Sequence, residues 1–228
     1  GLGQPENLAA IFSKAQQQLQ VPVFSLRSGL TPTGNDLGSR SMAPVGLPQV
    51  LIVGGEGTSE YEVGEMWHYF DTKVGLSASI VEQQHLLRAL NDPSIAYTHI
   101  LFPSGRYSFT ENDRARIEDW VKAGGVIVGQ KSALRYFAKH KWLDAEVVSR
   151  ETIDNAFDES DLSYEDGSSL YAKKLVAGAV FEADIDNTHP LFYGYSDDTL
   201  PMFKTNNMIV EASSSPFVTP ARYTDEPL

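Results

Sequence analysis

The 228-residue sequence predicts an α/β fold, with an open and mostly parallel sheet flanked by helices. Short apolar runs alternate with amphipathic stretches, and turns rich in glycine, serine and proline separate them. Short continuous apolar runs are typical of strands that are buried on both faces. A strand, a crossover helix and a second strand of these lengths form a right-handed parallel unit. The repeated alternation therefore indicates a parallel sheet with helices on its faces.

Residues 97–137 show this pattern most clearly. The apolar run at 99–102 ends in a Pro-Ser-Gly turn and predicts a buried strand. Thr110 is a candidate N-cap before acidic residues and an apolar stripe, and a Gly-Gly pair ends that helix. A further strand is expected at 126–128, and the next helix begins near Ser132. Because ligands in such sheets bind where strands end, the turns after these two strands are the expected site region.

The N-terminal residues 1–47 are expected to form a helix and a long loop that pack on the α/β domain. Apolar residues at helical spacing predict an amphipathic helix at 5–20. Residues 21–26 are a short strand candidate or an extended segment. Residues 27–47 are rich in glycine, serine, threonine and proline, which is typical of a long loop.

The first core strand is predicted at 50–53, directly before a Gly-Gly-Glu-Gly turn. Ser59 and Glu62 have the spacing of a capping box, in which each side chain bonds the backbone N–H of the other residue. The helix that they begin should face the core with four apolar residues, Val63, Met66, Trp67 and Phe70.

A strand at 78–81 and a short helix at 83–90 complete the alternating series. Strands and helices in this order are typical of open, doubly wound sheets. The sequence therefore predicts a flavodoxin-like core at 48–148.

Regular patterns weaken in residues 149–228, which we expect to be an irregular acidic extension with additional strands, part of the same domain. Residues 151–166 hold many acidic and no basic side chains, so a solvated or disordered surface loop is expected, with a cation site as the alternative. Strands are predicted at 175–183 and 208–212. The C-terminal residues show no closing helix, as expected of a truncated domain.

Composition argues against several kinds of function. The net charge of −12 disfavours nucleic acid or an anionic membrane as the main partner. The chain has no cysteine, which removes disulfides, thiolate zinc sites and cysteine nucleophiles. No apolar run approaches the roughly 20 residues that span a bilayer, so no membrane partner is expected.

The turn after the first strand, Gly-Glu-Gly-Thr-Ser-Glu at 55–60, has half of a dinucleotide-binding fingerprint. Glu82 stands where a ribose-binding acid would lie. However, Glu60 occupies the place of the third glycine, and further carboxylates crowd the helix start, where they would oppose a pyrophosphate. A tight strand-to-helix turn is favoured, and a nucleotide-binding module at 54–57 is the alternative.

The turn Val-Gly-Gln-Lys-Ser-Ala at 128–133 stands where a nucleophile elbow would lie, on a bend that lifts one side chain clear of the sheet. The lifted residue would be Gln130 or Lys131, and neither is a usual nucleophile there. Ser132 is better explained as an N-cap, and Ser104 has no histidine or acid close in sequence. No catalytic residue is therefore assigned, and a serine-type hydrolase that uses Ser104 or Ser132 is an alternative.

The histidines do not have metal-binding spacing. They are dispersed along the chain and form no H-x-x-E, H-E-x-x-H or H-x-H pattern. No metal site and no cofactor are therefore expected in this chain. The histidines are His68, His85, His99, His140 and His189.

Several segments together resemble known families. The Gly-Gly-x-Gly start, the Leu-Phe-Pro-Ser-Gly turn, Trp-Val-Lys-Ala-Gly-Gly and the following strand–elbow–helix resemble the class I glutamine amidotransferase-like fold. Asp-Leu-Gly-Ser at 36–39, Gly-Glu-Met-Trp-His-Tyr-Phe-Asp at 64–71 and Gly-Ala-Val-Phe-Glu-Ala-Asp-Ile-Asp-Asn-Thr-His-Pro-Leu-Phe-Tyr-Gly-Tyr at 178–195 resemble the C-terminal domain of large bacterial M14-type zinc carboxypeptidases. The resemblance runs from about Pro22 onward.

This resemblance carries over architecture and context, but neither set of catalytic residues. Amidotransferases of this class place a cysteine at the elbow, close to Gln130 here. They also need a late histidine with a nearby acid, whereas His189 is followed by Pro190 and Leu191. The carboxypeptidase zinc ligands would lie upstream, in a separate domain that would hold the metal.

The resemblance implies a non-catalytic accessory domain of a zinc carboxypeptidase, exported to the periplasm or secreted. It would dock the upstream peptidase domain or bind a small polar or carboxylate-bearing ligand. Arg106 and Lys131 are positive charges near strand ends, where they suit a carboxylate or an ion pair with Glu56, or balance nearby acids. The candidate crevice residues are Glu56, Ser104, Arg106, Tyr107, Gln130 and Lys131.

Overall fold

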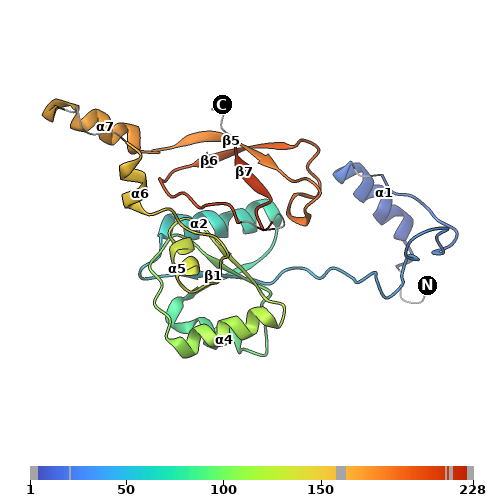
Figure 1. Ribbon diagram of the computed structural model, residues 1–228. Coiled ribbons are helices and arrows are strands. Elements are labelled where there is room, and N and C mark those ends of the chain that lie inside the picture. Colours follow the sequence, from blue (N-terminus) through green and yellow to red (C-terminus); the bar gives the residue numbers. More distant parts are fainter. Residues whose placement is uncertain (1–4, 21, 158–162, 214, 216–217, 225–228) are drawn as a thin grey trace. The chain divides into compact units, whose positions relative to one another are not determined.

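The structure is a computed structural model that describes residues 5–20, 22–157, 163–213, 215 and 218–224 (Figure 1). The chain divides into two compact units, Gly1–Leu47 and Pro48–Leu228. Each unit is described by itself.

The N-terminal unit contains one helix, α1 (Leu8–Leu19), in its described residues, and this confirms the helix expected at 5–20. The helix buries none of its side chains. The strand candidate at 21–26 is wrong for 22–26, which form no strand, and Val21 lies outside the described residues. Phe24 is 79% exposed, and a strand without a partner is not stable in water. Residues 27–47 form a loop without helix or strand, as expected.

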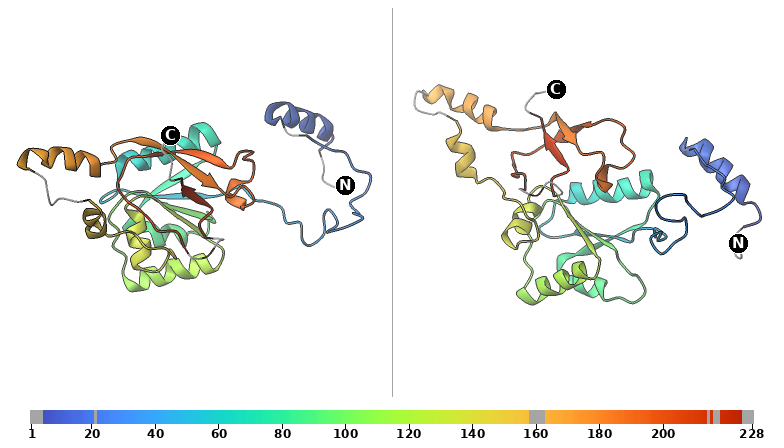
Figure 2. Two further views of the ribbon diagram at one scale, coloured as in Figure 1. Left: turned by 45° about the horizontal axis from the view of Figure 1, so that its top comes forward. Right: turned by 45° about the vertical axis from the view of Figure 1, so that its right-hand side comes forward.

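The second unit is built on a four-stranded parallel sheet, which confirms the predicted α/β fold (Figures 1 and 2). Its strands are β1 (Val50–Gly54), β2 (Ala78–Glu82), β3 (His99–Phe102) and β4 (Val126–Gly129), in the order β2-β1-β3-β4. Every neighbouring pair is parallel. This open order is flavodoxin-like, and it aligns the carboxyl ends of all four strands at one edge.

Helices cover both faces of this sheet. Figures 1 and 2 show α2 (Glu60–Tyr69) on one side and α4 (Glu111–Lys122) on the other. The α2 side buries Val50, Ile52 and Leu101 against Val63. The opposite core contains Phe102, fully buried, and residues of α3 (Leu86–Leu90), α4 and α5 (Ala133–Lys139). A short π-helix, η1 (Phe70–Val74), and a 3₁₀ turn, η2 (Gln83–His85), complete this part.

The two layers are unequal in coverage. Trp67 is 44% exposed, so its predicted place on the core face of α2 is wrong. Val126 and Val128 of β4 are 42% and 44% exposed, so this strand is not buried on both faces. Register places Val128 beside Leu101, on the α2 side of the sheet. In the described part of the chain, the helical residues that pack on this side of the sheet come from α2 and η1. They cover the central strands β1 and β3 and leave the edge strand β4 partly exposed.

The turn chemistry of α4 is as predicted. The Thr110 hydroxyl accepts from the backbone N–H of Asp113 at 3.1 Å, and the Asp113 carboxylate accepts from the backbone N–H of Thr110 at 3.3 Å. Gly124 follows the helix with φ of +110°, a conformation that glycine adopts without strain.

The later residues contain more regular structure than the sequence predicts. Helix α6 (Arg150–Asn155) and the 3₁₀ turn η3 (Tyr164–Asp166) replace part of the loop expected at 151–166, of which 158–162 lie outside the described residues. Helix α7 (Gly167–Lys174) follows directly. Strands β5 (Ala179–Ile185), β6 (Thr199–Lys204) and β7 (Ala221–Tyr223) form an antiparallel sheet in the order β6-β5-β7, and a short turn, η4 (Pro190–Phe192), lies between β5 and β6.

Two strand predictions in this region need correction. The strand expected at 175–183 starts later, at Ala179, and continues to Ile185. The strand expected at 208–212 is wrong, because Val210 makes only an isolated bridge to Val147. Strands β6 and β7 carry proline, lysine or arginine within short runs and therefore lack a clear apolar pattern.

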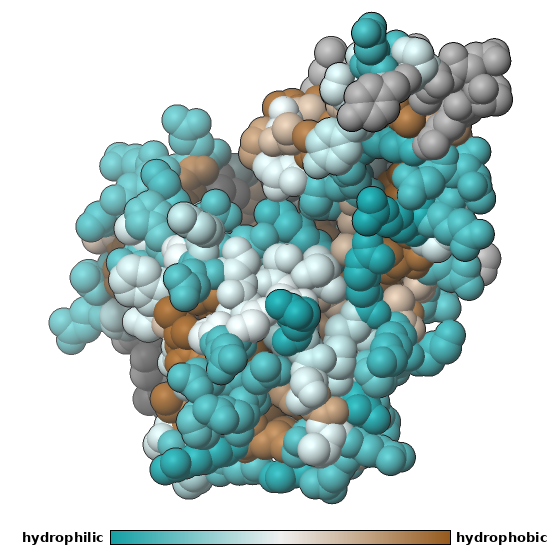
Figure 3. All heavy atoms as spheres, turned by 90° about the vertical axis from the view of Figure 1, so that its left-hand side faces the viewer, coloured by the Kyte–Doolittle hydropathy of each residue, from teal (hydrophilic) through white to brown (hydrophobic). Residues whose placement is uncertain are grey.

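In the described residues, no helix is long and apolar enough to cross a membrane. Hydrophilic residues cover most of the face that Figure 3 shows, and hydrophobic residues appear between them as smaller areas.

Candidate functional site

The turn between β4 and α5 places Lys131 in a strained backbone conformation. Its φ is +49°, in the left-handed region that non-glycine residues seldom adopt. The backbone N–H of Gln130 donates to Phe102 O at 3.1 Å, which extends the pairing of β3 and β4 to this point. From the sequence, either Gln130 or Lys131 could be the residue whose side chain the elbow lifts clear of the sheet. The backbone identifies Lys131 as that residue.

Glu62, in the first turn of α2, contacts the side chains of Gln130 and Lys131 in this elbow. Its side chain is 9% exposed, and its Oε1 lies 2.8 Å from Lys131 Nζ. Its Oε2 accepts from the backbone N–H of Ser104 at 2.6 Å and from Gln130 Nε2 at 3.2 Å. A buried carboxylate requires such partners, because burial without them is costly. Glu62 thereby joins α2 to the turns after β3 and β4.

This arrangement corrects the capping box predicted for α2. The Ser59 hydroxyl accepts from the backbone N–H of Glu62 at 3.4 Å, so half of the box exists. The Glu62 carboxylate does not complete it and binds Ser104, Gln130 and Lys131 instead.

Ser104 and Ser132 form a second contact at the same edge of the sheet. Their hydroxyl oxygens are 2.7 Å apart. Ser132 Oγ accepts from the backbone N–H of Gly105 at 2.8 Å and donates to Gly105 O at 3.2 Å. Ser132 occupies the N-cap position of α5 as predicted, but its hydroxyl makes no cap hydrogen bond with the helix. The hydroxyl of Ser132 is used to connect the β3 turn with the elbow.

These groups border a cavity of about 620 Å³, which we call the elbow pocket. Four basic and two acidic side chains line it, an excess of two positive charges in a chain of net charge −12. Asp154 lies 3.2 Å from Lys174 Nζ and 3.6 Å from Arg150 Nε. The lining residues are Glu62, Ser104, Lys131, Ser132, Arg135, Arg150, Ile153, Asp154, Tyr171, Lys174, Thr205, Asn206, Asn207 and Met208.

The structure brings together three of the predicted crevice residues. Ser104, Gln130 and Lys131 meet around Glu62, although Gln130 is not among the residues that line the pocket. Glu56 and Arg106 are exposed in the turns after β1 and β3 and are not among those that line the pocket either.

Tyr107 lies in the core rather than in the crevice. Its ring packs edge-on against Phe102, with ring centroids 5.2 Å apart, and its hydroxyl donates to Pro103 O. Burial, and secondly the negative charge of Glu62, raises the pKa of Tyr107 above its ordinary value. Tyr107 therefore packs in the core beneath the Pro103–Gly105 turn and stabilises that turn.

Sequence reasoning missed several pocket residues. The capping box accounts for Glu62 in the sequence, so the sequence gives no reason to expect its contacts with Ser104, Gln130 and Lys131. Arg135 had a usable signal, because it lies in the first turn of the helix that directly follows the elbow. Arg150, Asp154 and Lys174 had none, because they belong to helices α6 and α7, which the pattern did not predict, and residues 205–208 form no helix or strand.

The glycines after β1 serve the turn. Gly55 and Gly57 have φ of +84° and +88°. A Cβ at Gly55 would lie 2.7 Å from Glu82 Cγ, and Arg106 N donates to Gly57 O at 2.9 Å. These contacts explain both glycines without a nucleotide. In the part of the chain that the structure describes, no three histidine or acidic side chains are grouped as metal ligands would be.

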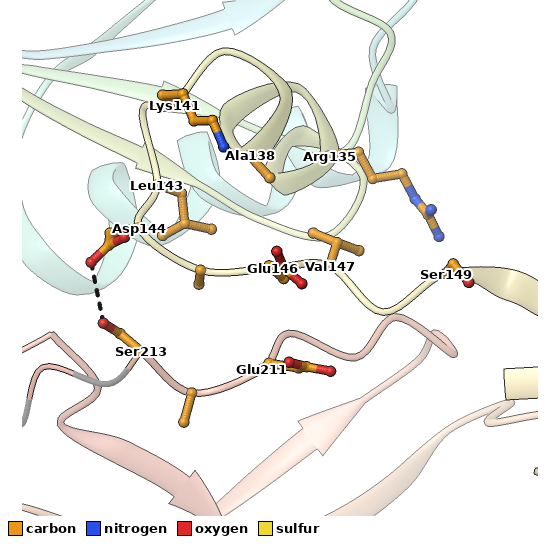
Figure 4. A pocket seen from close by; sticks show the side chains of 12 residues that line it. Arg135, Ala138, Lys141, Leu143, Asp144, Glu146, Val147, Ser149, Glu211 and Ser213 are labelled. Carbon is orange, nitrogen blue, oxygen red and sulfur yellow. Dashed lines mark hydrogen bonds between the residues drawn. The ribbon is translucent and has the colours of Figure 1, made fainter. Parts of the chain in front are cut away.

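A second cavity, of about 650 Å³, lies between the segment that follows α5 and residues 211–213 (Figure 4). The Ser213 hydroxyl donates to Asp144 Oδ2 at 3.3 Å across it. The backbone N–H of Glu211 donates to Glu146 O at 2.8 Å, which joins the two segments. Arg135 lines both this cavity and the elbow pocket.

Comparisons of the chain with models of known protein families, with curated proteins and with solved structures found no match.

Proposed function

We propose that this chain is a non-catalytic binding domain with an amidotransferase-like fold, whose elbow pocket takes a small carboxylate-bearing ligand. The observation that carries this proposal is the ion pair of Lys131 with the buried Glu62 at the elbow. An elbow of this kind presents the nucleophile in enzymes that have one. Here it presents an ammonium group, which has no lone pair for attack.

The charges of the pocket support an anionic ligand. An excess of positive charge in a cavity attracts and orients anions, even where the net charge of the whole chain is negative. The volume of about 620 Å³ is in the range of small-molecule sites. The Lys131 ammonium has three N–H donors, of which the Glu62 ion pair does not use all, so it would add a hydrogen bond to a carboxylate.

The resemblance to zinc carboxypeptidases supplies the proposed context. In this proposal the domain is an accessory part of an exported metallocarboxypeptidase, the zinc lies in the upstream peptidase domain, and that domain is the partner. This chain would need no cofactor of its own.

The test compares this chain with its longer natural parent. Bound zinc and release of C-terminal amino acids from peptides are measured in both. We expect zinc and activity in the parent and neither in the isolated chain. Zinc or turnover in the isolated chain would contradict the accessory role, and their absence from both would remove the peptidase context.

A serine hydrolase is the second candidate, because the hydroxyls of Ser104 and Ser132 are 2.7 Å apart beside a lysine. Lys131 would have to act as the base, and its ion pair with Glu62 opposes that role. Labelling of the folded chain by a fluorophosphonate, lost in Ser104→Ala or Ser132→Ala, would favour this candidate. Absence of labelling would exclude a reactive serine at this site.

A further inference from the structure

We infer that Arg135 is the residue that anchors the ligand carboxylate in the elbow pocket. This inference rests on the proposed binding function. Arg135 lies in the first turn of α5, four residues after Lys131 and three after Ser132. It lines the pocket together with Lys131 and Ser132. Figure 4 shows its guanidinium directed away from α5, on the side of Ser149 at the start of α6.

Arg135 differs from the other cations of the pocket in its partners. Lys131 pairs with Glu62, and both Arg150 and Lys174 pair with Asp154. Among the residues that the structure describes, no carboxylate lies within ion-pair distance of the Arg135 guanidinium, and no side-chain hydrogen bond of Arg135 is formed. The two acids of the pocket are thus already used by three cations, and Arg135 is the cation left for an external anion.

The chemistry of arginine narrows the class of ligand. Its planar guanidinium donates two parallel hydrogen bonds to a carboxylate, which a lysine cannot reproduce. The Lys131 ammonium borders the same space, and it has N–H donors beyond the one that faces Glu62, so it can bind a second polar group. The pocket therefore fits a small dicarboxylate or hydroxycarboxylate, with one carboxylate on Arg135 and the second polar group toward the elbow.

The experiment titrates succinate, malate and inorganic phosphate separately into the chain, followed by amide chemical shifts in NMR. The variants are Arg135→Gln, Arg135→Lys and the matched control Arg116→Gln, an exposed arginine of α4 that does not line the pocket. We expect succinate or malate to shift amides of the elbow and of α6. We expect the affinity to fall about tenfold or more in Arg135→Gln, to be only partly retained in Arg135→Lys, and to be unchanged in Arg116→Gln.

The outcomes separate the two proposals. Carboxylate binding at the pocket that is equal in wild type and Arg135→Gln would overturn the role of Arg135 and leave the binding function intact. Preference for phosphate over both carboxylates would overturn the ligand class. If none of the three probes shifts pocket amides, the binding function itself fails, and the anchoring role fails with it. An exposed arginine is not needed for folding, and unchanged spectra of the unliganded variants verify this.

Discussion

Lys131 and Glu62 show how a strained residue and a buried charge stabilise each other. A left-handed conformation costs an L-residue about 1 kcal/mol or more, and an unpaired buried carboxylate costs several times that. The ion pair at 2.8 Å and the two hydrogen bonds to Oε2 compensate both costs at one point. The elbow is thus held from α2, an element distant in the sequence.

Replacing Glu62 should therefore destabilise the fold. Removal of one partner from a buried pair costs about 3–5 kcal/mol. Because Lys131 is one-third exposed, we expect Glu62→Gln to lower the free energy of unfolding by an amount near the lower end of this range. Urea unfolding measures the change.

Glu65→Gln is the matched control for this experiment, because Glu65 is an exposed acid of the same helix. We expect it to change stability by less than about 0.5 kcal/mol. Equal effects of the two substitutions would show that Glu62 contributes only surface charge.

Tyr107 predicts how stability depends on pH in the alkaline range. Between the ordinary tyrosine pKa of about 10 and its raised pKa in the fold, the folded chain keeps a proton that the unfolded chain loses. The contribution of Tyr107 is therefore complete below about pH 10 and is lost as the pH rises. In Tyr107→Phe this decline should be shallower by up to about 1.4 kcal/mol per pH unit.

Urea unfolding at about pH 8 and at about pH 11 tests this expectation. Tyr61→Phe is the control, because Tyr61 is 89% exposed and does not belong to the core. If the free energy of unfolding declined equally between the two pH values in wild type and in Tyr107→Phe, Tyr107 would not be the source of the alkaline decline.

The strand–turn–helix element around the elbow depends on a glycine at the end of β4. A Cβ at Gly129 would lie 2.5 Å from the ring of Phe137, a buried residue of α5. Overpacking of this kind costs about 1–3 kcal/mol. We expect Gly129→Ala to lower stability by this amount and to disturb the elbow, measured by urea unfolding.

Gly64→Ala provides the opposite control, because Gly64 is inside α2 and a Cβ there meets nothing within 4 Å. Alanine in a helix interior is favoured by about 0.5–1 kcal/mol, so this substitution should stabilise the chain. The clash is tested further by combining Gly129→Ala with Phe137→Leu. If the loss of unfolding free energy in the double variant equals the sum of the two single losses, the proposed clash is wrong, because residues that clash should show coupling.

The elements of the core could be predicted because each carries its own local signal. Continuous apolar runs mark β1 and β3, and Thr110 with Asp113 marks the start of α4. Helix α6 was missed, although Ser149 accepts from the backbone N–H of Thr152 at 3.0 Å as an N-cap. Its acidic surroundings favoured a solvated loop over a helix.

The molecule as a whole concentrates its core in the second unit. Among the described residues, every buried hydrophobic side chain lies after Leu47. We expect a chain that starts at Pro48 to keep its fold, with a melting midpoint within about 4 °C of the full chain, which corresponds to about 1 kcal/mol. Thermal unfolding followed by circular dichroism measures it.

A much larger loss of stability would mean that residues 1–47 add to the core by packing on the domain, as the sequence analysis expects. The control is a chain in which Thr33→Ala replaces an exposed loop residue of the first unit, which should not change the midpoint.

The sequence by itself determined the parallel core, because burial of short apolar runs and the caps between them act locally along the chain. It also located the site region at the ends of β3 and β4. Only the tertiary structure decided that Lys131 is the elbow residue, that Glu62 pairs with it and that Arg135 borders a cavity of net positive charge. These contacts join residues from different elements, so their geometry depends on how the strands align, and no spacing along the chain encodes it.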